Sequence, residues 1–473
     1  MSTTEMTPDT PAPQTPVATV AAPARTGRGR WIDHWEPEDP DFWESTGKRV
    51  ANRNLWFSVF AEHIGFSMWT VWSVLVLFMG KGYGIDAASK FFLVALPALV
   101  GSVIRIPYTM APARFGGRNW TVASALLLMV PTVLAIIVME PGTSYTTFLI
   151  VAALAGVGGG NFASSMTNIN AFYPEGRKGW ALGLNAGGGN IGVAAVQLVG
   201  LLVIAVAGAS HPRIVLAVYV PLLIAAALGA ALYMDNLSTM RNDTGAMRDA
   251  VRDRQTWIMS FLYIGTFGSF IGYSFAFGLV LQNQFGRTPL QAASVVFIGP
   301  LIGSLIRPLG GWMADRFGGA KVTLLTFFGL ATATGVVILA SGLKSLPLFV
   351  AGFIALFVLS GVGNGSTYKM IPSIFVGKAR LEIEAGEARD VALLKARRLS
   401  GAVIGIAGAI GALGGVFINM TFRQSFLTEQ SGVPAFWSFL GFYALCVVVT
   451  YVVYLRPAPV AAPAHPRLAY AGV

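Results

Sequence analysis

Four ionisable side chains lie inside long apolar stretches of this sequence. They are Glu62, Arg105, Arg307 and Lys369, and His63 directly follows the first of them. Ionisable groups in hydrocarbon are costly and usually mark the path of a substrate or a proton. With Glu62 ionised, the four side chains carry a net positive charge, so the chemistry that they predict is the binding of an anion.

The two arginines occupy equivalent positions in two similar segments. Residues 104–122 read IRIPYTMAPARFGGRNWTV and residues 306–324 read IRPLGGWMADRFGGAKVTL, and the segments align without gaps. Related halves would bring Arg105 and Arg307 to one small ligand, because guanidinium groups bind planar oxyanions through paired hydrogen bonds. The alternative is that each arginine extends to the aqueous surface or forms a structural pair.

Glu62 and Lys369 are expected at similar depths in the two halves. We expect them to form an ion pair or a proton-coupling site, and the alternatives are a purely structural pair or a Glu62 that desolvation keeps protonated. His63 points about 100° away from Glu62 around a helix and is interpreted as a packing residue. The glycines around Asn190 (LGLNAGGGNIG) favour close helix contact and leave backbone open to a small ligand, and the Asn190 amide is expected to be buried.

The elements that must position these residues are long apolar helices. The chain has 473 residues, 54% apolar and 12% charged, whereas soluble domains carry about 25% charged residues. Twelve stretches have the roughly 20 residues that cross ~30 Å of hydrocarbon as a helix. The fold class is therefore an all-α polytopic membrane protein with twelve transmembrane helices in two parallel six-helix halves. The expected spans are 54–80, 90–111, 119–139, 144–167, 179–207, 213–234, 257–284, 288–313, 319–342, 346–376, 394–422 and 434–456.

The polar segments divide the chain into five parts. We expect a largely disordered tail (1–53), a six-helix bundle (54–234), a linker (235–256), a second six-helix bundle (257–456) and a short tail (457–473). Lys and Arg concentrate in alternate loops, on the side of the N-terminus. The tails and the linker are therefore expected in the cytoplasm, and the chain in the cytoplasmic (inner) membrane. The opposite loops hold only Lys81, Lys90, Arg213, Arg287, Lys344 and Arg423.

Composition also excludes several classes of protein. A single Cys and four His, without an HExxH pattern, predict no metal site, no cofactor and no catalytic residues. The net charge of +11 follows from the loop residues rather than from a nucleic-acid surface. We expect a monomer in a lipid bilayer, without an attached enzymatic or signalling domain, and alternating access rather than an open channel.

The motifs resemble a known family. The RFGG segments are similar to the loop motif of the major facilitator superfamily, most clearly in GGWMADRFGG. GGGNFASSMTNINAFYPEGRKGWALGLNAGGGNIG resembles the signature of its nitrate/nitrite porter family, and GVGNGSTYKMIPSIF and GAIGALGGVFI resemble the second-half counterparts. The similarity extends from about residue 54 to residue 456.

This resemblance implies secondary active transport of nitrate, and also of nitrite, with the anion between two arginines and aromatic rings. It also implies a proton-coupled nitrate importer, because AEHIGF and STYKMIP carry Glu62 and Lys369. A nitrate/nitrite antiporter, or a transporter of another small anion, is the alternative. The substrate-binding residues implied are Arg105, Arg307, Phe66, Phe162, Asn190, Tyr263 and Phe267.

Overall fold

The computed structural model describes residues 25–26 and 30–456. The first half contains α2 (Lys48–Thr70), α3 (Trp72–Phe78), η2 (Lys81–Tyr83), α4 (Ala87–Phe115), α5 (Gly117–Leu127), α6 (Met129–Val138), α7 (Tyr145–Ala155), η3 (Gly156–Gly160), α8 (Asn161–Phe172), α9 (Glu175–Ala207) and α10 (Pro212–Tyr233). The second half contains α12 (Arg254–Tyr263), η4 (Ile264–Gly268), α13 (Ser269–Phe285), α14 (Pro289–Val296), α15 (Ile298–Phe317), α16 (Gly319–Gly342), α17 (Leu346–Glu384), α18 (Arg389–Ala412), α19 (Gly414–Glu429), α20 (Val433–Thr450) and η5 (Tyr451–Leu455). Between the halves lie β3 (Asn236–Leu237) and α11 (Thr244–Arg252).

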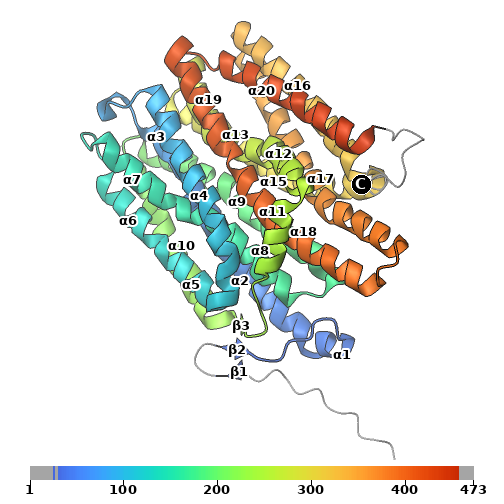
Figure 1. Cartoon of the computed structure of the whole chain (residues 1–473). Coiled ribbons are helices and arrows are strands. Elements are labelled where there is room, and N and C mark those ends of the chain that lie inside the picture. The colour runs from blue at the N-terminus through green and yellow to red at the C-terminus, as the bar shows by residue number, and fades with distance from the viewer. Residues whose placement is uncertain (1–24, 27–29, 457–473) are drawn as a thin grey trace, which may run out of the picture.

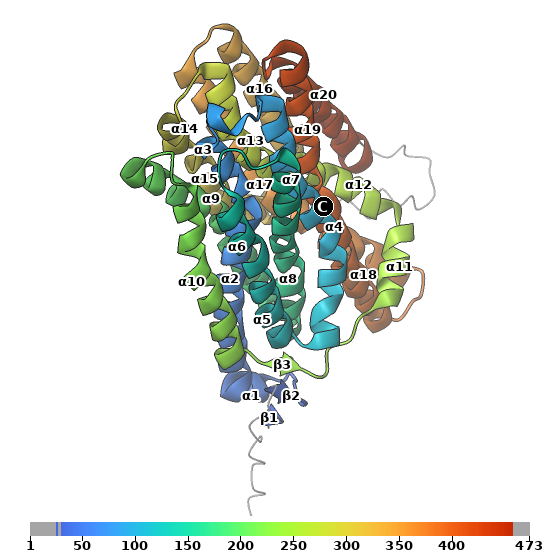
Figure 2. The same cartoon turned by 90° about the vertical axis from the view of Figure 1, so that its left-hand side faces the viewer.

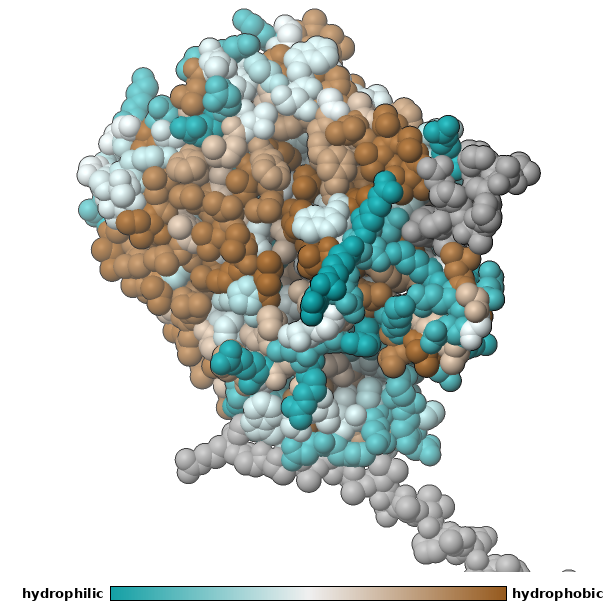
Figure 3. Space-filling view, in the orientation of Figure 1, coloured by the Kyte–Doolittle hydropathy of each residue, from teal (hydrophilic) through white to brown (hydrophobic). Residues whose placement is uncertain are grey.

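The helices supply the expected number of membrane spans. Eleven helical spans in the described part of the chain are long and apolar enough to cross a membrane, and several of them join consecutive elements, such as α5 with α6. The helix that ends with α2 and the following α3 together form a twelfth span, which bends by 41°. On the face shown in Figure 3, apolar side chains form a wide band across the middle, and hydrophilic ones gather toward the lower part and at the upper end. The helical fold with twelve spans in two halves, predicted from the sequence, is therefore confirmed. Most helix ends lie close to those expected, but α17 continues to Glu384 and α19 to Glu429, past the expected residues 376 and 422.

The repeated RFGG segment forms the same turn in both halves. Gly116 ends α4 with φ of +88°, and Gly318 ends α15 with φ of +91°. L-residues with a side chain rarely adopt this backbone conformation, so the turn requires glycine. In each half, the next span begins directly after this turn. Because Arg105 and Arg307 precede the same turn by the same number of residues, they occupy equivalent helices, α4 and α15.

The segment before the first span is folded, unlike the disordered tail expected up to residue 53. Trp31–Ile32 (β2) pairs antiparallel with Arg25–Thr26 (β1) and parallel with β3 of the linker. A turn of helix, α1 (Pro40–Phe42), and a π-helix, η1 (Trp43–Gly47), lead into α2 (Figure 1). Trp35, Phe42, Trp43 and other apolar residues of this segment pack together with side chains of α8 and α9. The expected tails also include 1–24, 27–29 and 457–473, which lie outside the described residues.

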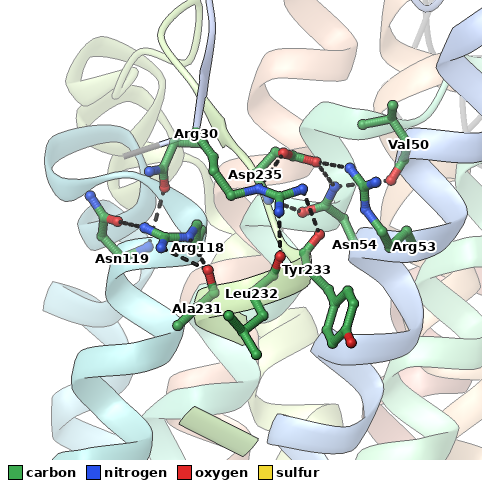
Figure 4. A network of polar contacts seen from close by, with 11 residues as sticks. Arg30, Val50, Arg53, Asn54, Arg118, Asn119, Ala231, Leu232, Tyr233 and Asp235 are labelled. Atoms are coloured by element: carbon green, nitrogen blue, oxygen red, sulfur yellow. Dashed lines mark hydrogen bonds and ion pairs between the residues drawn. The ribbon is translucent and has the colours of Figure 1, made fainter. Parts of the chain in front are cut away.

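A polar network anchors this segment to the end of the first half (Figure 4). The buried Asp235 carboxylate accepts hydrogen bonds from Arg30 (3.1 Å), Arg53 and Asn54 (3.2 Å). Arg118 donates two hydrogen bonds to the Ala231 carbonyl, at 2.9 and 2.7 Å. Figure 2 shows that the β strands lie at the same end of the bundle as α1. The linker and the N-terminal segment thus form one structured layer beneath the first half.

The two halves contact each other at the opposite end of the bundle. The Phe91 ring of α4 stacks on Phe422 (5.4 Å between centroids) and Phe426 (5.2 Å) of α19. Gln197 of α9 donates a hydrogen bond to the Ser274 carbonyl of α13, at 2.9 Å. These contacts join the bundles above the residues of the candidate site.

Candidate functional site

Arg105 projects from the middle of α4 toward the second half and is almost fully buried. Its Nε donates to the Gly159 carbonyl (3.1 Å) and its Nη1 to the Gly408 carbonyl of α18 (2.8 Å). The third nitrogen, Nη2, is buried and has no hydrogen-bond partner among the described residues. A buried charged donor of this kind is expensive unless a ligand or water pairs with it.

Arg307 lies at the equivalent position of α15 and is also buried. Its Nη2 is 3.4 Å from the Tyr263 hydroxyl, and its guanidinium lies 5.5 Å from the centre of the Tyr368 ring. Nη1 of Arg307 has no partner among the described residues. Each arginine therefore has one buried terminal nitrogen, with its two N–H groups, that has no partner among the described residues.

Aromatic rings connect the two arginines. The Tyr263 and Phe267 rings stack with centroids 5.3 Å apart and 15° between their planes, and Phe267 stacks on Phe162 of the first half at 6.4 Å. The Arg105 guanidinium lies 4.8 Å from the Phe162 centroid and 5.1 Å from that of Phe267. Because Tyr263 contacts Arg307, one stack of rings joins both arginines across the boundary between the halves.

Phe66 lies close to this arrangement, and Asn190 is buried in the same half of the molecule. The Phe66 ring contacts Phe162 at 5.9 Å between centroids, so it belongs to the aromatic cluster. Asn190 is buried on α9, and neither of its amide atoms has a hydrogen-bond partner among the described residues. The structure thus brings both arginines and all four expected rings together, and it leaves the Asn190 amide available for a ligand or water.

Glu62 is buried beside the site, on the same helix as Phe66. One carboxylate oxygen, Oε2, accepts hydrogen bonds from Ser165 and from Asn185 (2.7 Å), and the other has no partner among the described residues. Ser165 lies one turn along α8 from Phe162, which contacts Arg105. The carboxyl group and the guanidinium groups therefore share one polar interior.

Lys369 does not face Glu62, contrary to the expected ion pair. Its amino group lies 2.9 Å from a carboxylate oxygen of Asp315, and both side chains are about half exposed. The reason is its position around α17, because the next residues, Met370 and Ile371, are buried whereas Lys369 lies on an exposed face of the helix. His63, expected to be a packing residue, directs Nδ1 to the Gly188 carbonyl at 3.1 Å.

Several residues that contact the site were not assigned to it from the sequence. The Trp69 ring lies 5.3 Å from the Arg105 guanidinium carbon, and its Nε1 donates to the Pro97 carbonyl at 2.7 Å. Tyr368 lies against Arg307, and Asn185 binds Glu62. Trp69 could have been found from its spacing of seven residues from Glu62, and Asn185 from its place in the same glycine-rich run as Asn190.

The glycines of α9 and α18 explain the close approach of the helices. The Gly408 carbonyl is open to Arg105 because no side chain covers it. At Gly411, an added Cβ would lie 3.2 Å from Cγ of the Tyr263 ring, and at Gly189 it would lie 2.8 Å from the Glu62 carboxyl carbon. The expected close contact along these glycine faces is therefore present at the site.

The site's chemistry is that of an anion pocket with a neighbouring carboxyl group. Two guanidinium groups and one carboxyl group lie among flat rings and hydroxyl groups, and no group of three or more metal-binding side chains occurs in the described part of the chain. Such a site can bind a small flat anion by charge, by hydrogen bonds and by ring contacts.

Comparison with known proteins agrees with this fold. The family model described as Major Facilitator Superfamily matches residues 55–417, so the chain belongs to this superfamily. In fold, it is similar to the crystal structure of a D-xylose-proton symporter, with a TM-score of 0.61 and 17% sequence identity over 86% of this chain and 97% of that one.

Relatives of higher identity define the branch within the superfamily. The nitrate/nitrite transporter NarU of Salmonella typhimurium is 37% identical over 449 residues, which cover 90% of this chain and 97% of that protein. The probable nitrate/nitrite antiporter NarK2 of Thermus thermophilus is 34% identical over 462 residues, 91% of this chain and 98% of that protein. The chain is a member of the same nitrate/nitrite porter family, which consists of transporters rather than enzymes.

Proposed function

We propose that this protein transports nitrate, and also nitrite, across the cytoplasmic membrane by alternating access. The observation that carries the proposal is the pair of buried arginines on a stack of rings shared by both halves, each with a terminal nitrogen that has no partner among the described residues. Relatives named as nitrate/nitrite transporters support the identity of the anion.

Nitrate suits this site because it is small, planar and monovalent. Arg105 and Arg307 would hold its oxygens by charge and by their free N–H groups, since a guanidinium binds planar oxyanions in its own plane. Phe162 and Phe267 would contact the flat faces of the ion, and Tyr263 would share its hydroxyl between the anion and Arg307. Phe66 and Asn190 would complete the wall.

A competition experiment tests the choice of anion. Radiolabelled nitrate is bound to the purified protein in detergent, and unlabelled nitrate, nitrite, phosphate and acetate are added in turn. We expect nitrate and nitrite to displace the label and the other two to leave it in place. Displacement by phosphate or acetate at similar concentrations would favour the alternative, a transporter of another small anion.

We further propose that nitrate enters together with a proton, with Glu62 as the proton-binding group. With Glu62 ionised, it and the two arginines carry one net positive charge, and protonation of Glu62 raises this charge to two. The proton therefore strengthens the attraction of the site for an anion. By linkage, the anion strengthens proton binding by the same factor. Lys369, which is half exposed and paired with Asp315, has no part in this scheme.

The alternative is exchange of nitrate for nitrite, as the name of the Thermus relative says of that protein. Glu62→Gln separates the two mechanisms. We expect this variant to retain nitrate/nitrate exchange in liposomes but to lose net uptake driven by a pH gradient. Glu140→Gln, an exposed carboxyl at the far end of the bundle, is the matched control. Net uptake by Glu62→Gln that still follows the pH gradient would contradict proton symport through this residue.

We also propose that the protein is a monomer with both ends in the cytoplasm. The excess of Lys and Arg on the side of the N-terminus supports this orientation. Light scattering in detergent and protease access to the N-terminal segment in sealed vesicles test the two statements separately.

A further inference from the structure

The seventh span changes its helix type at the two aromatic residues of the site. α12 ends at Tyr263, η4 forms a π-helical turn over Ile264–Gly268, and α13 begins at Ser269. A π-turn contains more residues than the 3.6 of an α-helical turn, so it changes the angle around the axis between positions four apart. Tyr263 and Phe267 are four apart across this turn, and their rings stack with only 15° between their planes.

A chain of buried hydroxyl groups ends on this turn. The Ser269 hydroxyl donates to the Gly265 carbonyl at 2.7 Å, and the Ser269 and Tyr443 oxygens are 2.7 Å apart. Tyr443 and Tyr273 oxygens are 2.6 Å apart. All three side chains are at most 2% exposed.

The number of protons fixes the direction of this chain. Each hydroxyl group has one proton, and the Gly265 carbonyl can only accept. Ser269 therefore gives its proton to Gly265 and must accept from Tyr443, which in turn must accept from Tyr273. The order of donation is Tyr273 to Tyr443 to Ser269 to Gly265, and each link polarises the next.

The hydroxyl chain ends on the Gly265 carbonyl, which in a regular α-helix would accept a backbone N–H instead of a side-chain hydroxyl. In an α-helix the Ser269 N–H would donate to the Gly265 carbonyl, but here it points to the Thr266 carbonyl. The Ser269 side chain bonds Gly265 instead, and such a bond to the residue four positions earlier commonly bends a helix. The hydroxyl chain thus stabilises the altered course of the backbone between the two rings.

Neighbouring helices hold the other sides of the π-turn. At Gly268, an added Cβ would lie 2.7 Å from the Gly414 Cα and 2.8 Å from the Gly411 carbonyl oxygen, so the backbones are in direct contact. Thr266 and Thr367 share a hydrogen bond of 3.1 Å. The turn is therefore fixed by packing on one side and by the hydroxyl chain on the side of α20.

We propose that Tyr443, with Tyr273 and Ser269, is a positioning residue of the anion site. Its hydroxyl group holds η4 in the π form and thereby keeps the Tyr263 and Phe267 rings stacked between the two arginines. The inference rests on the proposed function, because it assigns these residues to the affinity of the same site. None of the three needs to touch the anion.

The test is a graded series of single-atom deletions. Tyr443→Phe removes the central link, and we expect the Kd for nitrate to rise about five-fold, the effect of losing roughly one net hydrogen bond. Tyr273→Phe removes only the first donor and is expected to raise the Kd by less than two-fold. Tyr145→Phe is the matched control, since its hydroxyl donates to the Ser89 carbonyl (2.9 Å) far from the site.

Hydrogen exchange of the amides of residues 263–270, measured without nitrate, gives a second readout. We expect faster exchange in Tyr443→Phe and unchanged exchange in Tyr145→Phe. The positioning role would be overturned if the amides of Tyr443→Phe exchanged at the wild-type rate, or if its Kd for nitrate equalled that of the wild type. Failure of the wild-type protein to bind nitrate would instead contradict the proposed function, while the exchange experiment would still decide the role of Tyr443.

Discussion

Replacement of Arg105 by lysine tests whether the geometry of the guanidinium group, and not its charge alone, binds the anion. In the wild type, Nε and Nη1 are used by the carbonyls of Gly159 and Gly408, which aims the free Nη2 into the site. A lysine keeps the charge but has one nitrogen, which cannot hold both carbonyls and also reach the anion. We therefore expect at least one charge-assisted hydrogen bond to the anion to be lost.

A hydrogen bond to a charged group contributes about 1.5–3 kcal/mol, so the Kd for nitrate should rise roughly 10- to 100-fold in Arg105→Lys. Titration calorimetry on the purified protein measures this change directly. Arg114→Lys is the control, because Arg114 lies on the same helix but is exposed. An affinity of Arg105→Lys within two-fold of the wild type would refute the reasoning, since charge alone would then suffice.

Three further variants test the remaining parts of the account. Lys369→Ala should leave nitrate uptake and its pH dependence unchanged and cost less than ~1 kcal/mol of stability, because the ion pair is half exposed; loss of pH coupling in liposomes would contradict this. Gly318→Ala should destabilise the protein by about 1–2 kcal/mol in thermal unfolding, because the backbone φ at this position is +91°. Gly311→Ala is the control and should not destabilise the protein, because Gly311 lies within α15 and faces open space. Equal effects of the two substitutions would contradict this expectation. The hydrogen bond from Arg398 lowers the pKa of Asp243 to about 2, so the contribution of this contact to stability is present above pH ~4 and is lost only as the pH falls through about 2. The small decrease in Tm of Asp243→Asn should accordingly be the same at pH 5 and pH 8, and a clear difference between them would be inconsistent with that pKa.

The parts of the fold that repeat were predictable from the sequence. The spans follow from apolar length, and the RFGG repeat predicts the equivalent positions of Arg105 and Arg307, because identical turns end α4 and α15. The convergence of the arginines on shared rings then follows from the pairing of two similar bundles.

The parts that depend on contacts between distant residues were not predictable. The N-terminal segment looked disordered because it is polar, but β2 finds its partner in β3, about 200 residues later. Lys369 was placed opposite Glu62 by its depth alone, whereas its direction around α17, toward Asp315, depends on how the helices pack. The partners of Glu62, Ser165 and Asn185, come from α8 and α9, and only the packing of these helices against α2 brings them to its carboxyl group.

The most direct test of the account is nitrate uptake by the purified protein in liposomes that contain no nitrite, with the internal pH recorded. Proton symport predicts uptake of nitrate with acidification of the interior, and loss of both in Glu62→Gln. Uptake that requires nitrite inside the liposomes and leaves the internal pH unchanged would contradict it, and would make the protein an exchanger in which Glu62 is a structural charge.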